Sequence, residues 1–326
     1  MSVLYEGVKH ICTKLTLQIP RFVVGVDGGG TKTVALVGTA RGKVLGRGEA
    51  GSSNYHNIGP IAASRAIRRS VIEAQRLAGL AGKKPEIAVV ALAAVDSEKD
   101  RLAAERFVRA AKIARESLVV HDSMAALYAA THGRPGIIVN SGTGCVAAGI
   151  NKAGKYSRAA GWGYIVDDEG SGYDIGRKAL QSAFRAIDGR APKTSLVSVF
   201  KRKFRVDELE DALRMIYAKG FGVETIAGLA PHVAKAASYD KVSREILNGA
   251  GIALADSACA VAKRLKMRND RFTIALVGGT FKAGKHLVDP LRRRIKQECP
   301  RAEVKSLRIE PARGALSLAV SELHRH

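Results

Sequence analysis

The chain has 326 residues, of which 46% are hydrophobic and 25% charged, and its formal net charge is +23. These proportions are typical of a water-soluble globular protein, and the length favours two domains. No uninterrupted apolar stretch reaches the ~18 residues of a membrane-spanning helix, so no membrane partner is expected. Residues 1–20 carry charges throughout and lack the apolar core of a signal peptide. We therefore expect a short extension, or a start codon placed too early.

The excess of positive charge fits nucleic-acid binding, an anionic small substrate or a general bias toward Lys and Arg. Its small clusters, at residues 201–203 and 292–294, fall in expected helices, where a solvated face is the simpler interpretation. Aromatic residues make up only 5% of the chain, so base stacking has little support and no nucleic-acid partner is expected. The four cysteines are widely spaced and form no zinc or iron–sulfur pattern, as expected of a reduced cytoplasmic protein.

The strongest local pattern is a hairpin with a glycine-rich tip. Residues 22–26 predict a buried strand, and residues 34–37 predict the strand that returns from it. The turn between them consists of Asp27, Gly28, Gly29, Gly30, Thr31, Lys32 and Thr33. Glycines allow close approach of a ligand, and the N–H groups of such a turn, with the Thr and Lys side chains, favour an anion site.

Asp27, at the end of the first strand, could hold Mg²⁺ through water. The plainer alternative is an ordinary hairpin with a flexible tip. Because a strand rather than a helix follows the glycines, the pattern is neither a P-loop nor a dinucleotide-binding fingerprint.

Beyond the hairpin, strands alternate with helices. Strands are expected at residues 43–49, 86–92 and 118–120, helices at residues 60–80, 99–111 and 124–130, and a polar loop at residues 51–57. This alternation predicts an α/β fold with a largely parallel sheet, whose ligands gather beyond the carboxyl ends of the strands. Asp27, Asp96 and Asp122 all fall at such ends, so we expect three carboxylates to converge on one cleft.

The second half of the chain opens as the first does. Residues 136–139 and 146–150 predict two strands, and residues 154–160 predict a third. The polar turn between the first two contains Asn140, Ser141, Gly142, Thr143 and Gly144. This repetition predicts two related halves, each with one phosphate-binding hairpin, and a border near residues 134–135.

The remainder is mostly helical in pattern. Ser171 is expected to cap a helix, with Asp174 three residues further on. Later elements are a helical region at residues 174–267, a strand at 272–277 that ends in Gly278 and Gly279, a basic helix at 285–298 and a last helix at 314–324.

Taken together and in order, the motifs resemble the BadF/BadG and N-acetylglucosamine kinase family, within the sugar kinase, actin and Hsp70 superfamily. They are Asp27-Gly-Gly-Gly-Thr, Asp122 at a strand end, Ser141-Gly-Thr-Gly, Gly161-Trp-Gly followed by Asp168-Glu-Gly-Ser, and Val277-Gly-Gly. The resemblance covers nearly everything from Arg21 onward and looks closest to the archaeal ATP-dependent hexokinases. It implies two actin-like (ribonuclease H-like) domains with a cleft between them, at residues 1–133 and 134–313, with the last helix packing back on the first domain.

The resemblance also implies an activity: ATP-dependent phosphorylation of the 6-hydroxyl of a hexose or amino sugar of the glucose, glucosamine and N-acetylglucosamine class. Residues 28–33 would hold the β- and γ-phosphates with Mg²⁺, and residues 141–144 would hold the phosphates from the opposite domain. Gly278 and Gly279 would lie against the adenosine, and Asp122 would be the general base. Sugar hydroxyls would bind Asn54, Asp96, Asp122 and Asp168, with Gly161 and Trp162 lining that pocket. A homodimer is implied as well.

Several of these positions have plainer interpretations. Asp122 could cap the helix that follows it, a role for which Ser123 competes, and Asp96 could be a turn or cap residue. Trp162 could belong to the core, and His121 could be a structural hydrogen-bonding residue.

Two positions depart from the family pattern. Asp167 adds a charge beside Asp168, where relatives often have Gly or Ser. Cys145 replaces a common Ser after the second turn, which leaves only its backbone N–H for a phosphate.

The alternative function is the ATPase activator of a 2-hydroxyacyl-CoA dehydratase. Such relatives hold an iron–sulfur cluster with two cysteines per chain in the middle region, where this chain has only Cys145. A third hypothesis, a basic non-catalytic protein that kept the fold, is disfavoured by the intact Asp27, Asp122 and glycine turns.

Overall fold

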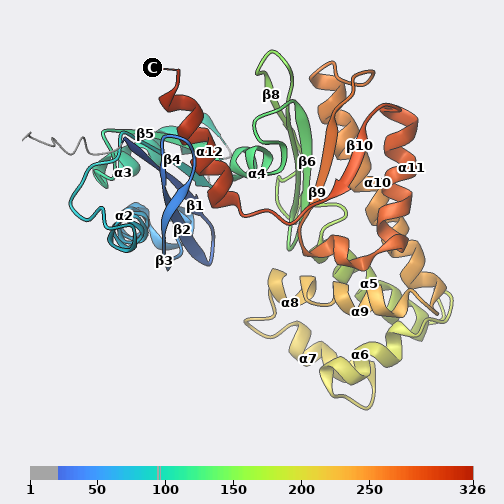
Figure 1. The fold of residues 1–326 in the computed structure, drawn as a ribbon. Helices are drawn as coiled ribbons and strands as arrows, with labels where there is room; N and C mark the ends of the chain where they lie inside the picture. The colour runs from blue at the N-terminus through green and yellow to red at the C-terminus, as the bar shows by residue number, and fades with distance from the viewer. Residues whose placement is uncertain (1–20, 94, 96, 326) are drawn as a thin grey trace, which may run out of the picture.

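Two five-stranded sheets organise the chain, and Figure 1 shows them side by side. The computed structural model describes residues 21–93, 95 and 97–325. The first sheet contains β1 Phe22–Gly28, β2 Lys32–Thr39, β3 Val44–Gly51, β4 Ile87–Leu92 and β5 Glu116–His121. The second contains β6 Gly136–Ser141, β7 Cys145–Ile150, β8 Tyr156–Ala159, β9 Thr273–Val277 and β10 Glu303–Ser306.

The two sheets repeat one topology. Their strand orders are β3-β2-β1-β4-β5 and β8-β7-β6-β9-β10. In each, the first strand pairs antiparallel with the next one along the chain and parallel with a strand that follows a helix. The prediction of two related halves is therefore confirmed. The prediction of a largely parallel sheet is confirmed only in part: in each sheet two strand pairings are parallel, and two are antiparallel and belong to a meander that precedes the helical crossovers.

The helices lie on the sheets and below the second one (Figure 1). They are α1 Tyr55–Ile58, α2 Pro60–Leu77, α3 Glu98–Ala110, α4 Asp122–Thr131, α5 Gly172–Ile187, α6 Leu196–Phe204, α7 Leu213–Ile216, α8 Val223–Ala227, α9 Ala230–Ala236, α10 Lys241–Arg264, α11 Lys285–Glu298 and α12 Pro311–Leu323, with two 3₁₀ turns, η1 Leu209–Ala212 and η2 Gly279–Ala283. The sequence patterns missed β10 and the short α1, which lies inside the expected polar loop.

Strands β1 and β4 read as continuous apolar runs because both of their faces are covered. On one face, Val24 and Val90 join a core with Ile67 of α2. On the other face, Val23 and Val89 join a core built around α4 and α12. A strand buried on both faces gives the carboxyl end of β1 a fixed position, and the first glycine turn begins there.

Helices α4 and α12 form a layer between the two sheets, as Figure 1 shows. Their core includes Ile138 and Ala148 of the second sheet as well as Val23 of the first. The approach is close enough that a Cβ added at Gly314 of α12 would lie 1.7 Å from the carbonyl oxygen of Ala125 in α4. The chain therefore ends in a helix that returns to the first sheet. The position of the domain border, near residue 134, remains a prediction.

Helix α10 is long and apolar enough, by length and composition alone, to cross a membrane. It packs instead inside the second lobe, which consists of the second sheet and its helices, and 56% of its most apolar stretch is buried there. Its residues Leu247, Leu254 and Ala258 belong to the core of that lobe. This burial is that of the core helix of a globular domain.

Candidate active site

The first glycine turn joins β1 to β2. The N–H of Gly29 donates to the carbonyl of Lys32 at 3.0 Å, and the N–H of Ser53 braces the turn by donating to the Gly29 carbonyl at 3.2 Å. Gly28 has no room for a side chain, because a Cβ there would lie 2.3 Å from Ser53 Oγ. Ser53 Oγ is itself buried and has no hydrogen-bond partner among the described residues.

The tip of this turn is open to solvent at Gly30, Thr31 and Lys32. The side chain of Thr33 does not add a hydrogen-bond donor at this tip, contrary to the expectation from the sequence. Its side chain is fully buried and its hydroxyl donates to the Gly51 carbonyl at 2.7 Å, so it stabilises the base of the hairpin.

The second glycine turn joins β6 to β7 and is held by two later segments. Gly142 accepts hydrogen bonds at its carbonyl from the N–H of Gly172, at 2.7 Å, and from Thr280 Oγ1, at 3.3 Å. Thr143 is exposed at the tip. The hydroxyl of Ser141 is buried and donates to the Gly170 carbonyl at 3.1 Å, so this side chain supports the turn and does not face a ligand.

Asp168 lies beneath the second turn. Its Oδ1 accepts the N–H of Cys145 at 3.1 Å, which means that this N–H is not left free for a phosphate as the sequence suggested. Asp168 is 7% exposed and sits in the left-handed region at φ +64°. Burial raises the pKa of Asp168, the bond from Cys145 opposes this rise, and the charge of Asp167 adds to it. Ser171 caps α5 through a bond from the Asp174 N–H, as predicted.

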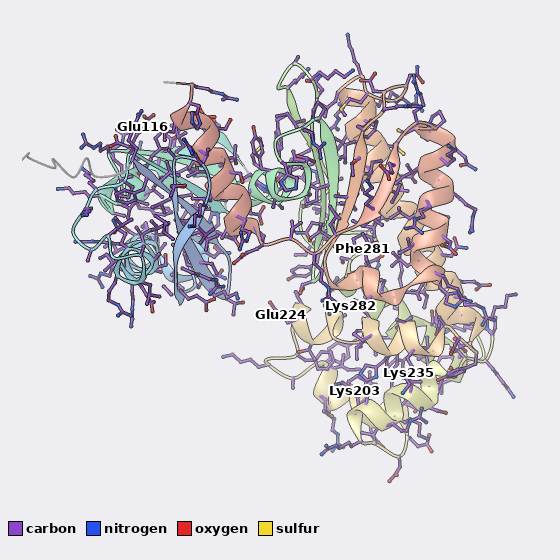
Figure 2. The ribbon with its side chains drawn as sticks, in the orientation of Figure 1. Glu116, Lys203, Glu224, Lys235, Phe281 and Lys282 are labelled. Atoms are coloured by element: carbon purple, nitrogen blue, oxygen red, sulfur yellow. The ribbon has the colours of Figure 1, made fainter. Side chains whose placement is uncertain are left out.

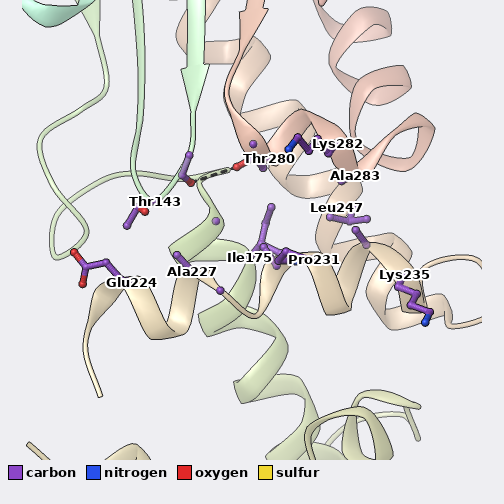
Figure 3. Close-up of a pocket in the computed structure, with 16 residues that line it drawn as sticks. Thr143, Ile175, Glu224, Ala227, Pro231, Lys235, Leu247, Thr280, Lys282 and Ala283 are labelled. Atoms are coloured by element: carbon purple, nitrogen blue, oxygen red, sulfur yellow. Dashed lines mark hydrogen bonds between the residues drawn. The ribbon is translucent and has the colours of Figure 1, made fainter. Parts of the chain in front are cut away.

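A cavity of about 670 Å³ opens beside the second turn (Figure 3). Gly142, Thr143, Gly279 and Thr280 line it on the turn side, and its other walls are mostly apolar. These walls come from α5, α8, α9, α10 and η2, and include Ile175, Ala227, Pro231, Leu247 and Ala283. Glu224, Lys235 and Lys282 line it as well, and Figure 2 shows Glu224 and Lys282 where the second sheet meets the helices below it.

The sequence pattern identified the glycines of this cavity but none of its helical walls. Residues 174–267 carried only a helical periodicity, which does not indicate which helix faces a ligand. Gly278 does not line the cavity but supports it, since a Cβ there would lie 2.1 Å from the Ser141 carbonyl oxygen.

Two carboxylates, Asp27 and Asp122, lie at the carboxyl edge of the first sheet. Burial, and then the charge of Asp122, raise the pKa of Asp27 to about 6, although the positive charge of Lys32 opposes the rise. Asp27 lies one residue before the end of β1 and Asp122 directly follows β5, so both stand at the same edge of the sheet, with β4 between their strands. The third expected carboxylate, Asp96, lies outside the described residues.

A half-buried carboxylate that also feels a second negative charge favours a bound cation. Among the described residues no group of three or more His, Cys, Asp or Glu side chains forms a metal site. Mg²⁺ commonly keeps several waters and takes only one or two carboxylates from a protein, and Asp27 is the residue that would hold such an ion here.

Asp122 is the first residue of α4, and neither it nor Ser123 is the cap of that helix. The cap is His121, whose Nδ1 lies 3.1 Å from the Ser123 N–H, 2.6 Å from Ser123 Oγ and 2.9 Å from Asp122 Oδ1. On the other side of the ring, His121 Nε2 lies 2.6 Å from Arg158 Nη1. The guanidinium of Arg158 also lies over the Trp162 ring, at 4.9 Å.

The remaining predicted sugar ligands come from both halves of the chain. Asn54 caps α1, with its Oδ1 accepting the His56 N–H at 3.1 Å. Trp162 is 66% exposed, so the alternative that it belongs to the core is wrong. Gly161 has φ +79°, a left-handed conformation that glycine adopts without strain.

Comparison with known proteins decides the family. The model of the BadF/BadG/BcrA/BcrD ATPase family matches residues 24–319. The chain belongs to this family. A curated relative, the N-acetylmuramic acid/N-acetylglucosamine kinase of Clostridium acetobutylicum, is 33% identical over 303 residues, which cover 93% of this chain and 99% of the relative. The N-acetyl-D-glucosamine kinase of Dictyostelium discoideum is 32% identical over 312 residues, which cover 91% of this chain and 97% of that relative.

Solved structures agree with this membership. A Chromobacterium violaceum protein, provisionally assigned as an N-acetylglucosamine kinase, superimposes with a TM-score of 0.73 at 28% identity and covers 92% of this chain and 99% of its own. A ROK family glucokinase from Streptomyces griseus, solved with glucose and AMPPNP, has a TM-score of 0.54 at 18% identity. The match covers 91% of this chain and 98% of the glucokinase. The family member described here therefore has the two-domain, actin-like fold of sugar kinases.

Proposed function

We propose that this protein is an ATP-dependent kinase that transfers the γ-phosphate of ATP to the 6-hydroxyl of a hexose or amino sugar, with the N-acetylglucosamine class as the first candidate. The observation that carries the proposal is that Asp27 and Asp122 both stand at carboxyl ends of strands in the first sheet, where the charge of Asp122 helps to raise the pKa of Asp27. One carboxylate can there receive a proton while the other faces a cation. The names of the two curated relatives support the sugar class.

The nucleotide base and ribose fit the 670 Å³ cavity, whose walls are mostly apolar and whose inner end meets the second glycine turn. The phosphates would extend from Thr143 toward the first turn. Residues Gly28 to Thr33 would then surround the terminal phosphates from the other lobe, chiefly through backbone N–H groups, because the Thr33 hydroxyl is already bonded.

Asp122 would orient the 6-hydroxyl of the sugar and accept its proton as the new O–P bond forms. Magnesium, when bound, neutralises phosphate charge near Asp27. Approach of the two lobes would exclude water from the γ-phosphate, which would otherwise be hydrolysed. In this proposal Asn54, Asp96 and Asp168 bind sugar hydroxyls, and Gly161 and Trp162 line the sugar pocket. Asp168 would act in addition to holding the Cys145 N–H.

The dehydratase-activator alternative is not favoured. Both curated relatives described above are named as sugar kinases. Within the described part of the chain Cys145, Cys259 and Cys299 are all buried and form no disulfide; Cys259 and Cys299 contact each other, whereas Cys145 lies in the second glycine hairpin. We further infer a cytoplasmic homodimer, for which the exposed side chains of Ile165 and Val166 offer a candidate contact surface; light scattering would test it.

The deciding experiment is a coupled assay of ADP release with glucose, glucosamine, N-acetylglucosamine and N-acetylmuramic acid. ADP should appear only when a sugar is present, and the panel identifies the accepted C2 and C3 substituents. Equal ATP turnover with and without every sugar would contradict the proposal.

Asp122→Asn should reduce sugar phosphorylation by at least about 10³-fold while leaving ATP affinity within a few-fold, because the amide cannot accept the proton. Asp289→Asn, at an exposed position of α11, is the matched control and should change neither quantity. Phosphorylation at the parent rate in Asp122→Asn would remove this carboxylate from the mechanism.

A further inference from the structure

The segment between β3 and α2 contacts both the first glycine turn and helix α3. Near its start, the N–H of Ser53 donates to the Gly29 carbonyl at 3.2 Å, and the Ser52 hydroxyl donates to the same oxygen at 3.4 Å. Asn54 follows as the cap of α1, a helix of four residues. None of the four is fully buried, so α1 depends on side-chain contacts with another element for its position.

One carboxylate of α3 supplies that contact. Asp100 Oδ1 accepts the Tyr55 hydroxyl at 2.7 Å, and His56 Nε2 lies 3.6 Å from the same oxygen. The other oxygen, Oδ2, accepts the N–H of Ser97 at 3.1 Å and its hydroxyl at 2.5 Å, within the capping box of α3. The Tyr55 ring packs against Phe107 of the same helix, with ring centroids 5.4 Å apart. Because a capping box occupies only one carboxylate oxygen, Asp100 caps its own helix and binds α1 at once.

The cap bond of α1 fixes which end of the Asn54 amide is available. Its Oδ1 accepts the His56 N–H at 3.1 Å. A backbone N–H can only donate, so the amide oxygen must lie at that end and the nitrogen, Nδ2, at the other. Within the described part of the chain Nδ2 has no hydrogen-bond partner, and the residue is half-buried. Asn54 therefore has N–H donors to offer a ligand.

We propose that Asp100 is a positioning residue which, through its bond to Tyr55, holds α1 so that the Nδ2 amide of Asn54 faces the sugar and donates to one of its oxygen atoms. The part played by Asn54 rests on the proposed function, whereas the bond between Asp100 and Tyr55 does not. An N–H donor recognises the lone pairs of a hydroxyl or of an N-acetyl carbonyl, and a carboxylate in its place would repel them. Because the same segment braces Gly29, this bond also fixes Asn54 relative to the proposed phosphate turn.

A double-mutant cycle on stability tests the bond itself. Tyr55→Phe removes the hydroxyl, and Asp100→Ala removes its acceptor. Tyr55→Phe should lower the urea midpoint of unfolding in the parent and lower it by less in the Asp100→Ala background, because the bond is already absent there. Tyr239→Phe, whose side chain is 62% exposed, is the matched control and should leave both midpoints unchanged. Equal shifts for Tyr55→Phe in the two backgrounds would overturn the proposal.

Asn54→Asp tests the donor. Aspartate caps a helix as well as asparagine does, so the melting temperature should stay within about 2 °C of the parent. KM for the sugar should nevertheless rise at least about 10-fold, while KM for ATP changes less than about 3-fold. Asn57→Asp introduces the same charge at an exposed position of the same helix and should change neither constant. An unchanged sugar KM in Asn54→Asp would contradict the role of the amide.

Combining the two changes tests whether Asp100 acts through Asn54. Asp100→Ala should raise KM for the sugar about 5- to 10-fold in the parent, since a misplaced donor binds poorly. In the Asn54→Asp background the same change should raise it less than about 2-fold, because no donor remains to be positioned. A general loss of structure would act equally in both backgrounds, and that result would mean that Asp100 does not position Asn54.

The stability and kinetic measurements fail separately. The double-mutant cycle needs no substrate, so it judges the bond between Asp100 and Tyr55 alone. If the cycle shows the expected coupling but the parent phosphorylates no sugar, the proposed function fails and the bond is still established.

Discussion

In the unliganded protein, ionisation of the Asp27 carboxyl destabilises the folded state. Burial and the charge of Asp122 raise its pKa from 3.8 to about 6. The folded carboxyl therefore holds its proton more tightly than the unfolded one. The resulting stabilisation is complete below pH 3.8 and is lost as the pH rises through about 6. The shift corresponds to at most about 3 kcal/mol of lost stability at neutral pH, and partial solvent exposure reduces this figure.

Asp27→Asn should consequently raise the melting temperature at pH 7.5 and leave it nearly unchanged at pH 4, because the amide never has to ionise. The same variant should lose the additional stabilisation that Mg²⁺ gives in the presence of ATP. Thermal unfolding at both pH values, with Asp289→Asn as the control, measures both effects. A change of the same size at pH 4 and pH 7.5 would show that the charge of Asp27 is not responsible.

At the scale of elements, the site depends on turns that admit no side chain. Gly278 has φ +114°, and a Cβ there would meet the Ser141 carbonyl oxygen at 2.1 Å, which is backbone of the second turn. Gly279, the next residue, has nothing within 4 Å of an added Cβ. Two adjacent glycines therefore have different roles: the first brings β9 against β6, and the second faces the cavity.

Gly278→Ala should lower the free energy of unfolding by about 2–4 kcal/mol, from backbone strain and overpacking together. Gly279→Ala should lower it by less than about 1 kcal/mol, since its methyl group meets open space. Urea denaturation of the two variants and the parent makes the comparison. Equal losses would contradict the difference in packing on which this prediction rests.

At the scale of the whole molecule, both lobes pack against the same layer of α4 and α12. A shift of either helix would therefore affect both lobes. Helix α4 starts with Asp122 and packs on strands of both sheets, while α12 packs on β1 and α4. Gly314 allows the two helices to touch, so the last helix of the chain determines where the proposed base sits.

Gly314→Ala should force α12 away from α4 and reduce stability by about 3 kcal/mol or more, with a loss of kcat larger than any change in KM for ATP. Gly249→Ala, also inside a helix but with open space around its Cβ, should stabilise the protein by about 0.5–1 kcal/mol. Thermal unfolding and the coupled assay on both variants give the comparison. Full activity in Gly314→Ala would show that the position of α12 does not influence the active site.

The sequence alone determined the elements whose signals are local. Continuous apolar runs predicted β1, β4, β6 and β9, because strands covered on both faces need no polar residues. Glycine-rich turns after β1 and β6 predicted the two hairpins, and their repetition predicted two similar halves. The sequence also predicted that Asp27 and Asp122 stand at the carboxyl ends of strands, and both do so in the first sheet.

Only the tertiary structure decided features that depend on distant segments. Asp168 bonds to the second turn, and Thr33 and Ser141 turn their hydroxyls inward, because segments far along the chain present carbonyl or N–H groups to them. The apolar cavity walls come from helices whose periodicity indicates a buried face but not what it faces. The contact of Arg158 with His121 joins two sheets. Local pattern encodes an element and its buried side, whereas the partner of a polar side chain is chosen by packing across the whole molecule.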